Sequence, residues 1–238
     1  MRVEFIDYIR FEISGFAKES LAGLGAGALV MDAGAGDPAY QVRDPRLRFV
    51  SVDLCVGQDD WDYSAIDVSA DLCALPFAAG DFDAVLCTPT LEHVSEPEAV
   101  LKELRRCLKP GGKLFLTAPQ EWYLHQPPHD YFRYTKYGLA HLLEKAGFKV
   151  ISTEPHGGYF LLMSHRIALF PRFFFPPVKN PLLRLLRKPF KELVVFIFTR
   201  LLPPVFVRMD RFDRDRYATA GYSVTAVATT PRTGATSI

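Results

Sequence analysis

The sequence predicts an α/β fold in which a mainly parallel sheet is covered by helices on both faces. Short apolar runs typical of strands alternate with segments whose apolar residues recur at helical spacing. The first predicted strand also runs directly into a glycine-rich turn, Gly34-Ala35-Gly36. In such sheets ligands lie outside the carboxyl ends of the strands, so we expect the functional residues at that edge.

Each element is predicted from its local pattern. Pro97 suits the first turn of one helix, while Thr135 and Gly147 suit the start and end of another. The segment 109–112 (Lys-Pro-Gly-Gly) predicts a turn, and the polar tail from Pro231 is expected to fray. These patterns predict strands at 28–31, 47–53, 81–88, 113–118, 148–153 and 222–229, and helices at 3–24, 97–108 and 135–146.

The charge of the chain is nearly balanced overall but unevenly distributed. A net charge of +1 on 238 residues gives no electrostatic case for nucleic-acid binding. Residues 159–208, however, carry nine Lys and Arg against one acidic residue. No uncharged apolar run reaches the roughly 18 residues of a spanning helix. Acidic residues interrupt the N-terminal apolar stretch, which argues against a signal peptide. We therefore expect a cytoplasmic protein.

Acidic residues follow the glycine-rich strand in a pattern typical of nucleoside binding. Asp53 ends the second predicted strand, where a carboxylate can accept hydrogen bonds from ribose hydroxyls. A dinucleotide-binding turn needs a third glycine, and this chain has Gly36-Asp37-Pro38-Ala39 instead. Asp32, two positions before the first glycine, would repel a pyrophosphate but tolerate a cationic ligand. The residues therefore favour a cationic nucleoside over a dinucleotide.

Five segments in this order resemble the class I S-adenosylmethionine-dependent methyltransferases of the type-11 group. They are VMDAGAG (30–36), VSVDL (50–54), DLCALPF (71–77), FDAVLCTPTLEHV (82–94) and LKPGGKLFLTAP (108–119). The resemblance implies a Rossmann-like three-layer sandwich whose seven-stranded, mostly parallel sheet has an antiparallel last strand. It implies S-adenosyl-L-methionine as cofactor, although Pro38 departs from the family pattern. The implied cofactor contacts are Asp32, Ala33, Gly34, Gly36, Leu54 and Thr88, with Asp53 at the ribose and Asp71 and Leu72 at the adenine.

Two histidines are candidates for catalysis at the acceptor. Transfer to a hydroxyl is helped by a base, and His93 and His129 follow predicted strands at the expected edge. His93 has the alternative of packing under the following loop. Arg133 is expected either to hold an acidic acceptor or to pair with an acid of its own loop. Tyr131 and Trp122 are candidates for the acceptor wall, and His125 is expected to face solvent. No cysteine pair or histidine has zinc-ligand spacing, so no metal site is predicted.

The resemblance implies a single methyltransferase domain over 1–238, with a core of about 25–158 and 217–230, and we expect residues 159–210 to be a helical insertion of basic and apolar residues between its last two strands. Asn180 and Pro181 predict a helix start, and Pro189 is expected to kink or restart that helix. Two interpretations compete. The insertion is either a helical lid buried against the domain or a second subunit, or an anchor that contacts a membrane surface through 172–207. If the insertion is a lid on a second subunit, we expect a homodimer. If it is an anchor, we expect peripheral contact with the inner face of the membrane.

The resemblance implies methyl transfer to a small-molecule, sugar or lipid-linked acceptor. Residues 127–148 resemble methyltransferases of cell-surface polysaccharide, lipid or natural-product biosynthesis. A non-catalytic, cofactor-binding or membrane-associated pseudo-methyltransferase is the main alternative. A Rossmann-type oxidoreductase is less favoured, because the third glycine of its turn is missing.

Overall fold

The structure, a computed structural model, describes residues 7–38, 41–57 and 61–229. The chain divides into two compact units, one of residues 13–154 with 221–238 and one of residues 1–12 with 155–220. The expectations for residues 3–6 and for the tail from Pro231 lie outside the described residues. The single-domain boundaries expected from the sequence stay a prediction.

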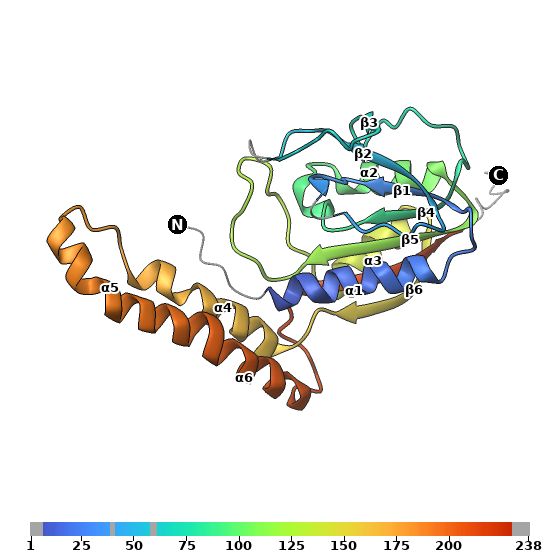
Figure 1. Ribbon diagram of the computed structural model, residues 1–238. Helices are drawn as coiled ribbons and strands as arrows, with labels where there is room; N and C mark the ends of the chain where they lie inside the picture. Colours follow the sequence, from blue (N-terminus) through green and yellow to red (C-terminus); the bar gives the residue numbers. More distant parts are fainter. Residues whose placement is uncertain (1–6, 39–40, 58–60, 230–238) are drawn as a thin grey trace. The chain divides into compact units, whose positions relative to one another are not determined.

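The larger unit contains a seven-stranded sheet in the order β3-β2-β1-β4-β5-β7-β6 (Figure 1). The last strand in the chain, β7, pairs antiparallel with β5, while β1, β2, β3, β4 and β5 pair in parallel. The fold class predicted from the sequence is therefore confirmed. The chain order reverses between β1 and β4, which is where such sheets bind ligands. The strands are β1 (Leu29–Ala33), β2 (Arg48–Asp53), β3 (Val68–Ser69), β4 (Phe82–Cys87), β5 (Leu108–Pro119), β6 (Phe148–Pro155) and β7 (Gly221–Ala228).

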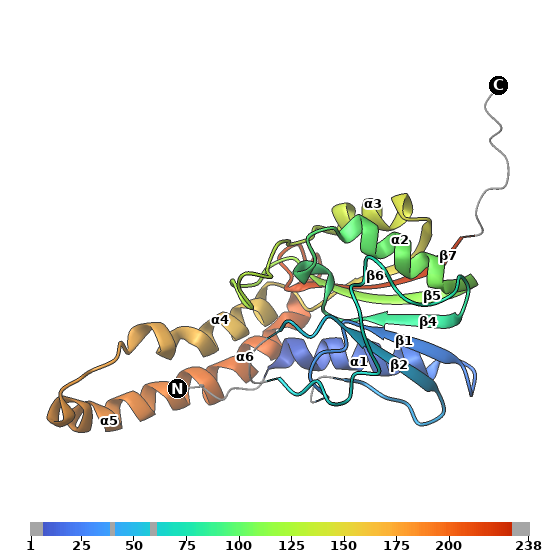
Figure 2. The same cartoon turned by 90° about the horizontal axis from the view of Figure 1, so that it is seen from above.

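Helices cover both faces of this sheet (Figure 2). The helices α2 (Pro97–Cys107) and α3 (Lys136–Lys145) lie on one face, and α1 (Tyr8–Ala22), from residue 13 onward, lies on the other. The amphipathic α2 turns its apolar residues to the sheet and buries them, as its spacing predicts. The hydroxyl of Thr135 accepts the amide hydrogen of Gly138 at the start of α3, which confirms the predicted cap.

One predicted turn is wrong. The segment 109–112 lies within β5, which begins at Leu108. The pairing of β4 with β5 shifts between Phe82 and Ala84, and Gly111 has a φ of +77°. Glycine adopts this backbone conformation at little cost, so the segment forms an irregular strand start instead of a separate turn.

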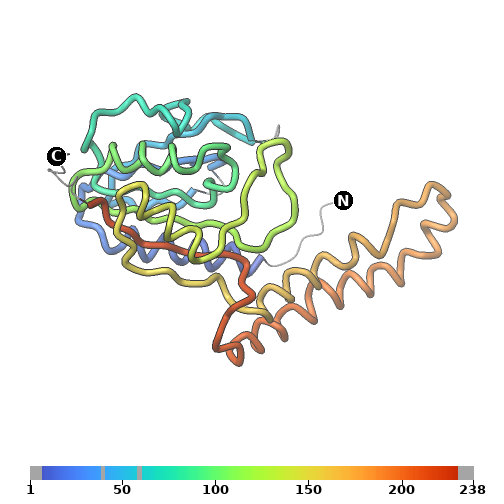
Figure 3. Tube along the Cα trace, turned by 180° about the vertical axis from the view of Figure 1, so that it is seen from behind, coloured from blue at the N-terminus to red at the C-terminus, as the bar shows by residue number. Residues whose placement is uncertain are grey.

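The smaller unit is a bundle of helices between β6 and β7: α4 (Tyr159–Phe174), α5 (Pro181–Phe196), the π-helical turn η3 (Ile197–Leu201), α6 (Leu202–Met209) and η4 (Asp210–Phe212). The tube in Figure 3 shows α4 running beside η3 and α6. Asn180 caps α5, as predicted, by accepting the amide hydrogens of Leu182 and Leu183. The helix does not restart at Pro189, because α5 is one helix to Phe196, and a kink there stays a prediction. A proline removes only one amide donor, and the irregular turn lies instead just before Pro203 and Pro204.

None of the helices in the described part of the chain combines the length and apolarity that crossing a membrane requires.

The two ends of the smaller unit are joined by a buried carboxylate. Asp210, 8% exposed, accepts hydrogen bonds from the amides of Gly158 (3.0 and 3.1 Å) and Leu161 (2.8 Å) at the start of α4. Asp213 accepts the amide hydrogen of Tyr159 at 2.7 Å. Gly158 occupies the cap position and has no side chain of its own, so the far end of the segment supplies the cap.

We predict that Asp210→Ala destabilises the start of α4 by about 1–3 kcal/mol, because buried amide donors lose a charged acceptor. Hydrogen exchange of residues 158–165 should accelerate. Asp215→Ala, which removes an exposed acid, is the control. Equal exchange in the two variants would show that Asp210 does not stabilise this end.

Candidate functional site

The glycine-rich turn after β1 is held against β2 by its own backbone. The amides of Gly34 and Ala35 donate to the carbonyl oxygen of Val52 at 2.8 and 3.1 Å. Gly34 has a φ of +76°, and a Cβ there would lie 2.2 Å from Cγ2 of Thr90. Only glycine fits this position. Both amides already donate to the Val52 carbonyl oxygen. A ligand at this turn could approach the backbone closely, because Gly34 has no side chain, but it would not receive hydrogen bonds from these two amides.

Asp53 at the end of β2 is oriented by two backbone amides. Its Oδ2 accepts from the amide of Gly36 at 3.0 Å, and its Oδ1 accepts from the amide of Cys55 at 2.7 Å. The residue is half-buried, and each carboxylate oxygen has a second lone pair for a ribose hydroxyl. The neighbouring Leu54 is 50% exposed and offers an apolar surface to a flat base. The carboxylate oxygens of Asp53, which accept hydrogen bonds, and the exposed side chain of Leu54 together fit a nucleoside.

Asp32 lies in a different environment from the one its motif suggests. Its side chain is buried and forms an ion pair with Arg43 at 2.5 Å, while the same guanidinium donates to the hydroxyl of Ser51 at 2.7 Å. Burial raises the pKa of Asp32, and the bond to Arg43 opposes that shift. The charge expected to face a ligand is thus partly balanced by an arginine that the motif does not indicate. A cofactor contact by Asp32 stays a prediction.

The remaining cofactor candidates lie along the same part of the sheet. Ala33 and Thr88 lie at the carboxyl ends of the neighbouring strands β1 and β4. Asp71 is exposed and accepts the amide hydrogen of Cys73 at 2.8 Å. The side chain of Leu72 is buried in the hydrophobic core that also contains the apolar residues of α2 and α3. The contacts assigned to these residues by the resemblance remain predictions.

The two candidate histidines, His93 and His129, are connected by a contact between the ring of His93 and the backbone of His129. His93 lies in the short helix η2 (Leu91–His93) after β4, and His129 lies in the loop 120–134 after β5. The amides of Tyr131 and Phe132 donate to the carbonyl oxygen of Glu92 at 2.9 and 3.3 Å, which holds this loop on η2. Nδ1 of His93 lies 2.5 Å from the carbonyl oxygen of His129. The ring of His129 faces Tyr131, with Nδ1 3.4 Å from the phenol oxygen.

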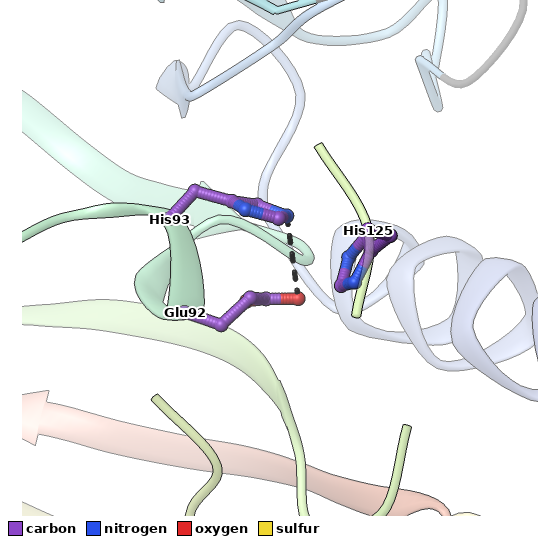
Figure 4. Close-up of side chains that lie close together, drawn as sticks. All are labelled: Glu92, His93 and His125. Carbon is purple, nitrogen blue, oxygen red and sulfur yellow. Dashed lines mark ion pairs between the residues drawn. The ribbon is translucent and has the colours of Figure 1, made fainter. Parts of the chain in front are cut away.

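Two residues that the sequence analysis did not select complete this cluster. Figure 4 shows the side chains of Glu92 and His93 directed toward His125, and Glu92 Oε1 lies 3.8 Å from His93 Nε2. Burial raises the pKa of Glu92 to about 7 and lowers the pKa of His93. The expected solvent-facing position of His125 is wrong, because its amide donates to Asp130 and its ring lies 4.7 Å from that of His93, centroid to centroid. The sequence could have indicated both residues by their position, because Glu92 follows β4 and His125 follows the neighbouring strand β5.

Arg133 is bound within its own loop. Its two terminal nitrogens bond both oxygens of Asp130 at 2.6 and 2.9 Å and the carbonyl oxygens of Phe132 and Tyr123. Its Nε donates to the carbonyl oxygen of Trp122. The pair holds the pKa of Asp130 down at about 2. These bonds match the ion-pair alternative; an acceptor contact by Arg133 stays a prediction, as it does for Trp122 and for the 47% exposed Tyr131.

Comparison with known proteins agrees with this geometry. Residues 29–116 match a family model described as a methyltransferase domain. A ubiquinone biosynthesis O-methyltransferase of Xanthomonas oryzae pv. oryzae is 39% identical over 103 residues, 43% of this chain and 38% of that protein. A demethylmenaquinone methyltransferase of Renibacterium salmoninarum is 37% identical over 98 residues, 37% of this chain and 40% of that protein. The chain thus spans about two-fifths of the length of these curated relatives.

A solved structure shares the fold across nearly the whole chain. The 1,6-didemethyltoxoflavin-N1-methyltransferase of Burkholderia thailandensis, with bound S-adenosylhomocysteine, covers 94% of this chain and 80% of its own at a TM-score of 0.54 and 18% identity. The sheet order and this structural likeness show the class I methyltransferase fold, and the family match places a methyltransferase domain at residues 29–116. Residues 29–116 thus resemble the type-11 methyltransferases, in agreement with the motifs of the sequence.

We predict that Asp53→Asn weakens S-adenosylhomocysteine binding about tenfold or more, because hydrogen bonds to a charged acceptor contribute about 1.5–3 kcal/mol. Isothermal titration calorimetry measures the change. Asp81→Asn removes a carboxylate just before β4, at the opposite end of the strands, and should bind as the unaltered protein does. Unchanged affinity in Asp53→Asn would remove this carboxylate from the cofactor site.

Proposed function

We propose that the protein transfers a methyl group from S-adenosyl-L-methionine to a hydroxyl group of a small, apolar, quinone-like acceptor. The observation that carries this proposal is the position of the histidine-bearing loop 120–134. It is hydrogen-bonded to η2, immediately after the strand that borders the nucleoside-binding edge. The names of the relatives, one for ubiquinone biosynthesis and one for demethylmenaquinone, support a quinone-like acceptor.

The exposed side chains of the loop support the same acceptor class. Tyr123, Leu124, Tyr131 and Phe132 are 49, 71, 47 and 37% exposed. Apolar and aromatic surface of this kind stacks on a flat ring and gains free energy by covering it. A sugar has fewer apolar faces to cover, so the loop favours an aromatic acceptor over the saccharide alternative.

S-adenosyl-L-methionine, when bound, supplies a methyl group on a positively charged sulfur. Asp53 fixes the ribose, and the turn at Gly34 admits the rest of the molecule close to the backbone. His129 takes the proton of the acceptor hydroxyl as the new carbon–oxygen bond forms and the sulfur–carbon bond breaks. We assign this role to His129 and not His93, because the His93 ring is turned toward Glu92 and fixed at Nδ1.

The proposed reaction is tested by incubating the purified protein with S-adenosyl-L-methionine and separate catechol, hydroquinone and sugar acceptors. Mass spectrometry measures S-adenosylhomocysteine and the methylated product. We expect both products with the aromatic hydroxyl compounds. Methylation of sugars alone would overturn the acceptor class. Cofactor binding without product from any acceptor would favour the non-catalytic alternative.

We predict that His129→Gln lowers kcat by about 10²- to 10⁴-fold, because a general base contributes an acceleration of that size. The affinity for S-adenosylhomocysteine should not change, since His129 lies outside the cofactor residues. Steady-state kinetics on the best acceptor and calorimetry on the same preparation measure the two effects. A kcat within twofold of the unaltered enzyme would show that His129 is not the base.

We also propose that the smaller unit contacts an anionic membrane surface through α5. Seven of its apolar residues occupy one side of the helix and are 55–67% exposed, while Val194 is its buried residue. Four basic residues lie on the opposite side. An exposed apolar face with a basic counterpart fits an interfacial helix on anionic headgroups. The apolar set is Leu182, Leu183, Leu185, Leu186, Phe190, Leu193 and Phe196, and the basic set is Arg184, Arg187, Lys188 and Lys191.

We predict that the protein sediments with vesicles containing phosphatidylglycerol and less with pure phosphatidylcholine. Replacing Leu182 and Leu186 by Ser, or Arg184 and Lys188 by Glu, should each lower the bound fraction severalfold, since each basic residue contributes about 1 kcal/mol. Lys149→Glu, an exposed change on β6, is the control. Equal sedimentation of all variants, or dimers that disappear in the leucine variant, would overturn the membrane assignment.

A further inference from the structure

We propose that Glu92, His93 and His125 bind a divalent metal ion of the Zn²⁺ type. One ligand atom from each of these side chains lies within 4.8 Å of the other two. The sequence predicts no metal site, because these three residues lack the close spacing along the chain that zinc motifs have. Here η2 supplies two ligands and the loop after β5 supplies the third (Figure 4).

Both imidazoles have one nitrogen fixed and the other available. Nδ1 of His93 lies 2.5 Å from the carbonyl oxygen of His129, which only accepts, so Nδ1 carries the hydrogen and Nε2 has the lone pair. Nδ1 of His125 lies 3.1 Å from the carbonyl oxygen of Tyr123 and 3.4 Å from Asp130 Oδ2, which places its hydrogen on Nδ1 too. Metal-binding histidines are typically oriented in this way by an acceptor on the far nitrogen.

Glu92 supplies an independent observation. Its side chain is 2% exposed, and Oε2 has no hydrogen-bond partner within the described residues. A buried polar atom without a partner costs about 1–3 kcal/mol, so such atoms usually indicate a water or an ion. The other oxygen of the same carboxylate lies 3.8 Å from His93 Nε2. A cation between these groups would satisfy the carboxylate and compensate its buried charge.

The distances fit a site that closes slightly around an ion. Zinc bonds of about 2.0–2.1 Å place tetrahedral ligand atoms about 3.4 Å apart. The Glu92–His93 pair at 3.8 Å is near this separation, and the ligand atom of His125 lies within 4.8 Å of both. The backbone already holds the two segments together, through the amides of Tyr131 and Phe132 on the Glu92 carbonyl. Little reorganisation is therefore needed.

The donor set indicates both the ion and its use. Two imidazole nitrogens and one carboxylate oxygen suit Zn²⁺ and its first-row neighbours. Three protein ligands leave a coordination position open, as in catalytic metal sites. The open position takes an oxygen ligand, from water or, if the proposed function holds, from the acceptor hydroxyl. Coordination would hold that oxygen in place and lower the pKa of its proton.

The proposal is tested by titrating ZnCl₂ into chelator-treated protein, without S-adenosyl-L-methionine or acceptor, and measuring heat and bound metal. We expect one equivalent per chain. Glu92→Gln and His125→Ala should each weaken binding at least about tenfold. His141→Ala, which removes an exposed histidine on α3, should bind as the unaltered protein does. No bound zinc in the unaltered protein, or equal binding in Glu92→Gln, would overturn the site.

Two further measurements keep this test separate from folding and from the methyltransferase proposal. X-ray absorption of the zinc-loaded, unaltered protein should show nitrogen and oxygen neighbours at about 2.0–2.1 Å. Sulfur neighbours would place the ion at a cysteine and overturn the proposal. S-adenosylhomocysteine titrations of the same variants report the cofactor site. Loss of zinc with normal S-adenosylhomocysteine affinity supports the metal site, whereas product formation in the absence of any metal binding would leave only the proposed function standing.

Discussion

The carbonyl oxygen of Glu92 accepts the amide hydrogens of Tyr131 and Phe132, and the rest of the candidate site depends on this bond pair. It holds the long loop after β5 on the short helix after β4. Together with the contact of His93 Nδ1 with the carbonyl oxygen of His129, it fixes the position of His125 and His129 relative to His93. The loop is therefore held on η2 mainly through its backbone, while Oε2 of Glu92 has no hydrogen-bond partner among the described residues.

The sheet and its helices could be predicted from sequence because their signals are local. Apolar periodicity identified α2, and the cap at Thr135 identified α3. The elements that could not be predicted in this way also have physical reasons. The two-residue strand β3 is too short to carry a periodic signal, and the start of β5 depends on a glycine conformation within a pairing irregularity. Pro189 shows that a residue known to interrupt helices does not end one wherever it occurs.

The candidate site was predictable by position but not by chemistry. The motifs placed Asp53 and His93 correctly at strand ends, because parallel strands end at a shared edge. They gave no information on which charges meet there. Arg43 partly balances the charge of Asp32 through a contact that no motif indicates, whereas the pair of Asp130 with Arg133 lies within one loop and matches one of the two sequence expectations. Glu92 was overlooked although it adjoins a selected histidine, since burial becomes visible only in three dimensions.

The closure of the smaller unit by Asp210 and Asp213 has a consequence for how this chain can vary. The amides of Gly158 and Tyr159 are bound by carboxylates that come from the far end of the same segment, and Thr219 donates to the carbonyl oxygen of His156. The first and last residues of this segment are thus joined by hydrogen bonds in which α5 and α6 between them take no part. A change in the length of the helices between these two ends would leave the bonds that join the ends in place.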